Sequence, residues 1–270
     1  MATMAVWATV LIMYGVFTGS VQHPAEHIIP LDMALKSVDD MYQGCNDKMK
    51  AKAREVYLPN EKNINSDFTK AWDDAELNYK KKYKKKRRPS TGLEKEQALA
   101  IYVYTLEKPN VYVDFNNAVR TQRSEYNTKF TYHALHFFLT DALQALKKKH
   151  ENCLTVFRRV NTHFSQNVLN MEIRFGSFAS SSLGKYPQER FGDKSCFEIE
   201  TCFGADISLY SKYTESEGEV LIPPYEIFKV IDIKTRSKQK VLPCEVVYKL
   251  KSTRTPVSYL NCALFPNKQY

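Results

Sequence analysis

The feature that most constrains the fold of this chain is a change in the spacing of its apolar residues near residue 152. Before that point apolar side chains recur at helical spacing. After it, short runs rich in β-branched and aromatic residues are separated by Gly, Pro or polar clusters. Such segregation predicts an α+β fold rather than alternating α/β. The phosphate-binding motifs GxGxxG and GxxxxGK are also absent, which disfavours a doubly wound nucleotide fold.

The pattern indicates where the elements lie. Helices are expected at 31–42, 45–57, 68–79, 93–107 and 130–150. Strands are expected at 154–160, 171–182, 196–208, 219–222, 227–234 and 241–251.

The N-terminus has the composition of a secretory signal. Residues 1–25 carry no charged side chain, and 5–17 form a run dominated by apolar residues. That length suits a signal-peptide core of roughly 7–15 residues, whereas a membrane span needs about 20. We expect 1–22 to be a signal peptide and 23–270 to form the mature, secreted domain. A buried helix or an uncleaved anchor is the alternative, because the usual basic start is missing. No apolar tail of the kind that directs a C-terminal lipid anchor is present.

Six cysteines, Cys45, Cys153, Cys196, Cys202, Cys244 and Cys262, would then lie in an oxidising compartment. An even number there indicates disulfides, and six cysteines allow 15 pairings. Metal binding is disfavoured because no Cys-x-x-Cys pair occurs.

Positive charge is concentrated in one segment. The net charge is +9, and eight Lys and Arg residues lie between 80 and 88, so the rest is close to neutral. This distribution argues against a nucleic-acid partner. The run 80–88 is interpreted as a solvated helix end or loop, with weak binding of heparin-like anionic polymers as the alternative.

Three stretches of the strand-rich half carry polar side chains beside apolar ones. They are Thr155–Arg159, Phe175–Ser182 and Glu215–Pro224. Each alone is typical of a surface ion pair, a strand edge or a solvated loop. Their order is more informative, with 22 residues from Arg158 to Ser180 and 39 from Ser180 to Glu219.

In this combination the sequence resembles the extracellular mono-ADP-ribosyltransferases that modify arginine, relatives of the arginine-modifying bacterial toxins. The resemblance rests on LDMALKSVDDMYQGC at 31–45, YVYTLEKPNVYVDFNNAVR at 102–120, HFFLTDALQAL at 136–146, TVFRRV at 155–160, RFGSFASSS at 174–182 and EGEVLIPPYEIF at 217–228. It implies helices that lead into a split antiparallel sheet around an NAD cleft.

The resemblance places the family's arginine, serine and Glu-x-Glu signature on Arg158, Ser180, Glu217 and Glu219. NAD would be the ADP-ribose donor, with Arg158 on its phosphates. Glu219 would stabilise the positive charge that develops on the ribose as nicotinamide leaves, and Ser180 would hold Glu219 in place. Glu217 would bind an incoming arginine and take its proton. Gly218 would permit a loop or bulge that lets both carboxylates reach the cleft.

The same resemblance suggests further contacts. Tyr104, Ser177 and Ser211 would lie at the cofactor, and Tyr213 would help to dock the acceptor. For Tyr104 a core position on a helix is an equal alternative. Arg159 stands where the family commonly has a small residue, so it would either crowd the phosphate site or add a second cation there.

Family pattern also implies the disulfides Cys45–Cys262 and Cys153–Cys202, which leave Cys196 and Cys244 for a third. The expected activity is transfer of ADP-ribose to arginine on extracellular proteins. Two alternatives stay open: an NAD glycohydrolase, and a secreted non-catalytic module that binds through 80–88.

Overall fold

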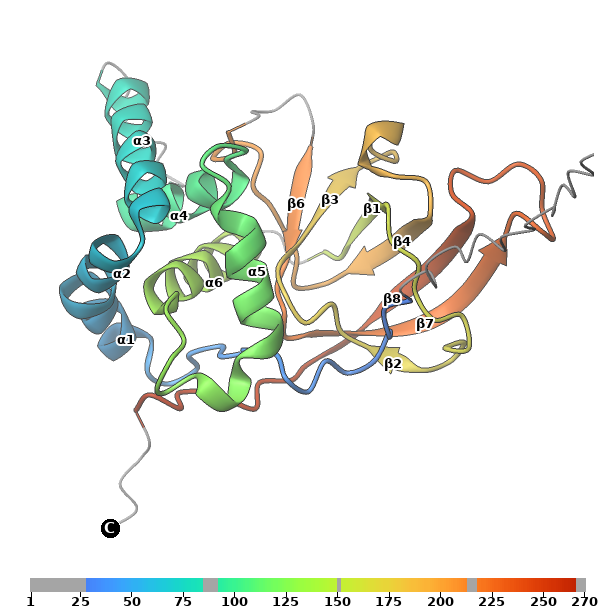
Figure 1. The fold of residues 1–270 in the computed structure, drawn as a ribbon, viewed down its shortest axis with the longest axis horizontal. Helices are drawn as coiled ribbons and strands as arrows, with labels where there is room; N and C mark the ends of the chain where they lie inside the picture. The colour runs from blue at the N-terminus through green and yellow to red at the C-terminus, as the bar shows by residue number, and fades with distance from the viewer. Residues whose placement is uncertain (1–27, 85–91, 150–151, 213–217, 266–270) are drawn as a thin grey trace, which may run out of the picture.

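The computed structural model describes residues 28–84, 92–149, 152–212 and 218–265. A helical part precedes the strands, and the two lie side by side (Figure 1). The helices are α1 (Asn46–Lys52), a π-helical turn (Ala53–Tyr57), α2 (Leu58–Ile64), α3 (Ser66–Tyr83), α4 (Lys95–Thr105), α5 (Val111–Thr121) and α6 (His133–Lys147). The strands are β1 (Leu154–Val160), β2 (Glu172–Ile173), β3 (Ala179–Leu183), β4 (Ser195–Thr201), β5 (Ala205–Asp206), β6 (Glu219–Ile222), β7 (Glu226–Thr235) and β8 (Val246–Pro256). Single 3-10 turns occur at Arg123–Glu125 and Glu189–Phe191.

Local sequence explains where the helices begin. Asn65 caps α3, because its side chain accepts hydrogen bonds from the backbone N–H groups of Asp67 and Phe68. Glu94 and Gln97 form a capping box at the start of α4. In the described part of the chain, no helix is both long and apolar enough to cross a bilayer.

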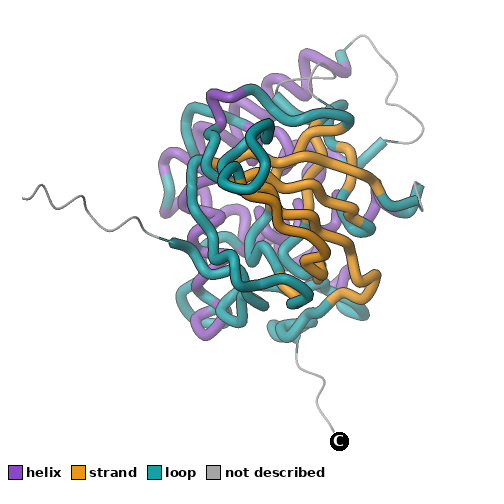
Figure 2. The backbone as a smooth tube through the Cα atoms, turned by 90° about the vertical axis from the view of Figure 1, so that its right-hand side faces the viewer, coloured by secondary structure: helices purple, strands orange, loops and turns teal. Residues whose placement is uncertain are grey.

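The strands form one mixed sheet in the order β2-β7-β8-β4-β1-β3-β6-β5. Figure 2 shows the strands side by side, with most helices behind them. Every described pair is antiparallel except β4 with β8. The α+β prediction is confirmed. The parallel pair was not expected from the sequence, and it arises because β8 reaches β4 only after the intervening chain has crossed the sheet.

Two apolar clusters meet at β3 and β6. Along these strands side chains alternate, so Phe178 and Leu221 join the helical cluster while Ala179, Val220 and Ile222 join the second cluster on the other face. β3 and β6 therefore lie between the two apolar clusters, and one face of these strands packs against the helices.

The helix expected at 31–42 is absent: this segment is irregular, with positive φ at Ala34 and Tyr42. Tertiary contacts override the helical spacing here. Asp39 forms a fully buried ion pair with Arg174, at 2.7 Å between Oδ2 and Nη1, and the backbone N–H of Val38 donates to Val119. Conversely, α5 was not expected. Its apolar positions Val111, Phe115, Ala118 and Val119 do follow helical spacing and are buried.

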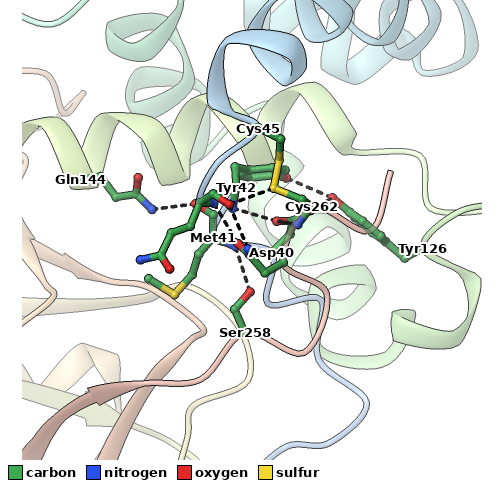
Figure 3. Close-up of a disulfide and its surroundings, with 10 residues drawn as sticks. Asp40, Met41, Tyr42, Cys45, Tyr126, Gln144, Ser258 and Cys262 are labelled. Carbon is green, nitrogen blue, oxygen red and sulfur yellow. Dashed lines mark hydrogen bonds between the residues drawn. A yellow bond between two sulfur atoms is a disulfide. The ribbon is translucent and has the colours of Figure 1, made fainter. Parts of the chain in front are cut away.

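All three disulfide pairings are as expected: Cys45–Cys262, Cys153–Cys202 and Cys196–Cys244. Around the first, Asp40 accepts hydrogen bonds from the backbone N–H groups of Tyr42 and Cys262 and from the hydroxyl of Tyr126 (Figure 3). The disulfide and this carboxylate together attach the C-terminal segment to the N-terminal part of the chain.

Candidate active site

Strand register brings two of the expected residues onto one face. Glu219 is the partner of Ser182 across the β3–β6 ladder, and Leu221 is the partner of Ser180. Residues two apart on a strand share a face. Ser180 and Glu219 are therefore diagonal neighbours on the face that Leu221 turns toward the helices.

The Glu219 side chain is held by the turn that follows β5. The hydroxyl of Ser211 donates to Oε2 of Glu219 at 2.7 Å. The turn itself is fixed to β6, because the N–H of Ile207 donates to the carbonyl of Glu219 at 2.9 Å. Ser211, whose expected contact with the cofactor stays a prediction, thus orients the carboxylate.

Arg158 reaches the same region from β1. Its Nη1 donates to the carbonyl oxygen of Ser180 at 2.6 Å. Burial lowers the pKa of this guanidinium from its usual value, and the nearby charge of Arg120 lowers it further. Among the described residues, neither Arg158 nor Arg120 forms an ion pair with a carboxylate. Two cations close together without such a partner can attract an anion.

Arg159 lies elsewhere. Successive side chains of β1 point to opposite faces, and Arg159 is the register partner of Cys196 in β4. It is buried, and its Nη2 donates to the carbonyl oxygen of Pro243 at 3.0 Å. It neither crowds the Arg158 side of the sheet nor adds a cation there, so the concern about this departure from the family pattern is not supported.

Tyr104 is a core residue of α4 whose hydroxyl reaches the backbone beside β3. Its ring is buried in the helical cluster on α4. Its hydroxyl donates to the carbonyl of Phe178 at 3.1 Å and accepts from Nδ2 of Asn116 at 3.0 Å. Burial raises the pKa of Tyr104, and a hydrogen bond with Ser180 partly opposes that rise. A core tyrosine therefore presents its hydroxyl to the strand that carries Ser180.

Ser177 is buried, and its hydroxyl is already engaged by Arg120, whose Nη2 donates to it at 2.7 Å. Nη1 of Arg120 donates to the carbonyl of Phe175, also at 2.7 Å. Sequence analysis missed Arg120 and Asn116 as site residues. They are four residues apart on α5, on one side of that helix. Since no helix was expected there, the spacing carried no signal.

Glu217 and Tyr213 lie outside the described residues. Gly218, between the two glutamates, has φ +54°, and a side chain there would meet the Cβ of Leu183 at 3.1 Å. Glycine adopts this conformation without strain. The backbone before Glu219 thus departs from a regular strand, as expected.

The profile of the family "NAD:arginine ADP-ribosyltransferase" matches residues 31–247. The chain belongs to this ADP-ribosyltransferase family. Ecto-ADP-ribosyltransferase 5 of Rattus norvegicus is 35% identical over 244 residues, 87% of this chain and 76% of the relative. The erythroblast NAD(P)(+)–arginine ADP-ribosyltransferase of Gallus gallus is 34% identical over 252 residues, 87% of this chain and 82% of the relative.

Solved structures agree with the family assignment. The eucaryotic mono-ADP-ribosyltransferase ART2.2 matches with a TM-score of 0.70 and 31% identity, covering 88% of this chain and 100% of that chain. A variant of ART2.2 with NAD bound matches with the same TM-score, identity and coverage. This ADP-ribosyltransferase is thus a family enzyme whose ADP-ribose donor is NAD. Its three disulfides and the extracellular ("ecto") relatives indicate a protein of the secretory pathway.

Proposed function

We propose that this enzyme is secreted and transfers ADP-ribose from NAD to arginine side chains of extracellular proteins. The observation that carries the proposal is the meeting of Arg158, Ser180 and Glu219 around β3. Arg158 bonds to the backbone of Ser180, and Glu219 shares a strand face with it. The proposal includes a signal peptide at 1–22 and a catalytic domain at 23–270.

The donor would be held mainly by positive charge. The guanidinium of Arg158 offers a planar fork of donors that matches phosphate oxygens. Arg120 adds a second guanidinium, anchored on Phe175 and Ser177. The hydroxyl of Ser180 on β3, with that of Tyr104 beside it, provides neutral hydrogen-bonding groups for the sugar. This arrangement is consistent with a bound dinucleotide whose diphosphate faces the arginines.

The chemistry assigned to Glu219 is electrostatic. The bond between the ribose and nicotinamide breaks with its electron pair going to nicotinamide, so positive charge develops on the ribose. A carboxylate already oriented by Ser211 stabilises that charge without reorganising. The guanidino nitrogen of the acceptor then forms the new bond and loses a proton, which we assign to Glu217.

Glycohydrolase activity is the competing function, with water in place of arginine. Incubating the mature protein with labelled NAD, with and without agmatine as a small guanidino acceptor, tests the choice. We expect an ADP-ribosylated agmatine product and one nicotinamide released for each product. If free ADP-ribose were the only product at saturating agmatine, the transferase proposal would be wrong.

A further inference from the structure

The basic end of α3 is attached to the turn that orients the catalytic carboxylate. Nζ of Lys82 donates to the carbonyl oxygen of Leu209 at 2.5 Å. Nζ of Lys212 donates to the hydroxyl of Tyr102 at 2.9 Å. Between these two anchors lies Ser211, which bonds to Glu219. The C-terminal end of α3, which carries the other lysines, is thereby attached to this turn.

The lysines at the C-terminal end of α3 carry charge that no ion pair in the described residues neutralises. Lys80, Lys81 and Lys84 are exposed. In the described part of the chain none of them forms an ion pair, whereas nearby Glu76 is paired with Lys95. Asp74 on α3 attracts the charge of Lys212, and it also accepts a hydrogen bond from the hydroxyl of Tyr102. We call Lys80, Lys81, Lys84 and Lys212 the basic surface.

A cleft lies between the C-terminal end of α3 and the active-site turn. Lys82 lines it, whereas the residues of the basic surface lie outside it. It has a volume of about 130 Å³ and is lined by Asn78, Tyr79, Lys82, Tyr102, Tyr210 and Ser211, among others. It lies between α3 and α4 and ends at the residue that holds Glu219. Tyrosines and an asparagine at its walls suit an extended polypeptide, because they offer flat apolar rings together with hydrogen-bonding tips.

We propose that the basic surface selects acceptor arginines that are flanked by acidic residues. This inference rests on the proposed transferase function. An arginine acceptor is itself a cation, so a lysine-rich surface beside the site repels it. Carboxylates close to the arginine in the acceptor chain convert that repulsion into attraction, and complementary charge of this kind sets partner choice. Both the sign of the surface and the attachment of its helix to the active-site turn favour an acidic polypeptide.

The test compares two peptides that differ in charge alone. Both contain one arginine, flanked by Asp and Glu in the first peptide and by Asn and Gln in the second. We expect kcat/KM to be about tenfold higher for the acidic peptide at low salt, and the ratio to shrink as ionic strength rises. Equal values for the two peptides would overturn the proposal.

Variants test whether the preference for the acidic peptide depends on the basic surface. In Lys80→Gln/Lys81→Gln/Lys84→Gln the ratio of kcat/KM for the acidic peptide to kcat/KM for the neutral peptide should fall toward one. Turnover of agmatine should stay unchanged. The matched control is Lys229→Gln/Lys249→Gln/Lys251→Gln. It removes the same charge from exposed positions on β7 and β8, on the other side of the molecule from α3 (Figure 1). The control should keep the preference. A preference that survives in the α3 variant would contradict the assignment.

Two further results separate this inference from other outcomes. Retention on heparin that depends on the α3 lysines, without any peptide preference, would identify the surface as a polymer-binding site and overturn the inference. Failure to modify agmatine at all would instead refute the transferase function on which the inference depends.

Discussion

The hydroxyl of Ser211 lies 2.7 Å from Oε2 of Glu219 and donates a hydrogen bond to it. The two residues come from different elements, a turn after β5 and the first position of β6. The carboxylate is thus oriented before any substrate binds, and this preorganisation is the property that electrostatic catalysis requires.

Removing that hydrogen bond should impair turnover more than binding. We expect Ser211→Ala to lower kcat about tenfold with little change in KM for NAD, because the carboxylate loses its fixed orientation. Ser211→Thr retains the hydroxyl and should restore most of the rate. Nicotinamide release under saturating NAD measures the effect. An increase in KM at unchanged kcat would make Ser211 a binding residue only.

Replacing the carboxylate itself has a larger predicted effect. Glu219→Gln should lower kcat by about 10²–10³-fold, because the amide is nearly isosteric but carries no charge. The melting temperature and the affinity for NAD should change little, since the carboxylate acts mainly in the transition state. Titration calorimetry with NAD and a thermal melt provide the controls. A variant with full activity would exclude Glu219 from the reaction.

The adjacent arginines of β1 provide a matched pair. Arg158→Lys keeps the charge but loses the planar fork, so KM for NAD should rise about tenfold. Arg159→Lys alters a side chain that bonds to Pro243 on the opposite face, so KM should stay the same while stability falls slightly. Initial rates over a range of NAD concentrations distinguish the two. Equal effects on KM would mean that β1 does not separate these side chains as described.

Two buried histidines of α6 should make stability depend on pH. Burial lowers the pKa of His133 to about 4 and that of His136 to about 3. Between these values and the unfolded value near 6.5, the unfolded chain binds more protons than the folded one. The histidines therefore favour unfolding as pH falls below about 6.5. For His133 the loss is roughly 1–3 kcal/mol by pH 4.

Asp40 and Glu61 act in the opposite sense. Burial raises the pKa of Asp40 to about 6 and that of Glu61 to about 8, so their contribution to stability falls as pH rises toward those values. A comparison of variants isolates the histidine effect. Urea unfolding at pH 5 and pH 7 should show that His133→Gln gains stability at pH 5 relative to the wild-type protein. An equal difference in the free energy of unfolding between the two proteins at both pH values would contradict this prediction.

The order of elements could be predicted because it depends on local pattern. Leu135, Phe138 and Leu139 repeat at helical spacing and are buried on α6, and the short β-branched runs become strands. The segment 31–42 does not follow its local pattern. Its apolar residues follow helical spacing, yet the buried ion pair of Asp39 with Arg174 holds the segment in an irregular path. Such contacts between residues far apart in sequence leave no periodic signal.

Family resemblance located the signature residues, but it could not say how they are held. It assigned the support of Glu219 to Ser180, which stays a prediction, and it did not predict the hydrogen bond from the hydroxyl of Ser211 to that carboxylate. The resemblance also did not say on which face of the sheet the Arg159 side chain lies. The alternation of side chains along β1 and its register with β4 place that side chain on the face away from Arg158.

The sequence by itself determined the fold class, because the spacing of apolar residues is a property of the chain. The resemblance to the family implied the disulfide partners, which the structure confirms, and the signature residues, whose roles stay predictions. The tertiary structure alone decided that Arg120 lies close to Arg158, that Ser211 orients Glu219, and that Lys82 attaches the end of α3 to that turn. Each of these contacts joins segments whose separation in sequence is unrelated to their distance in space, and only the packing of the helices against β3 and β6 brings them together.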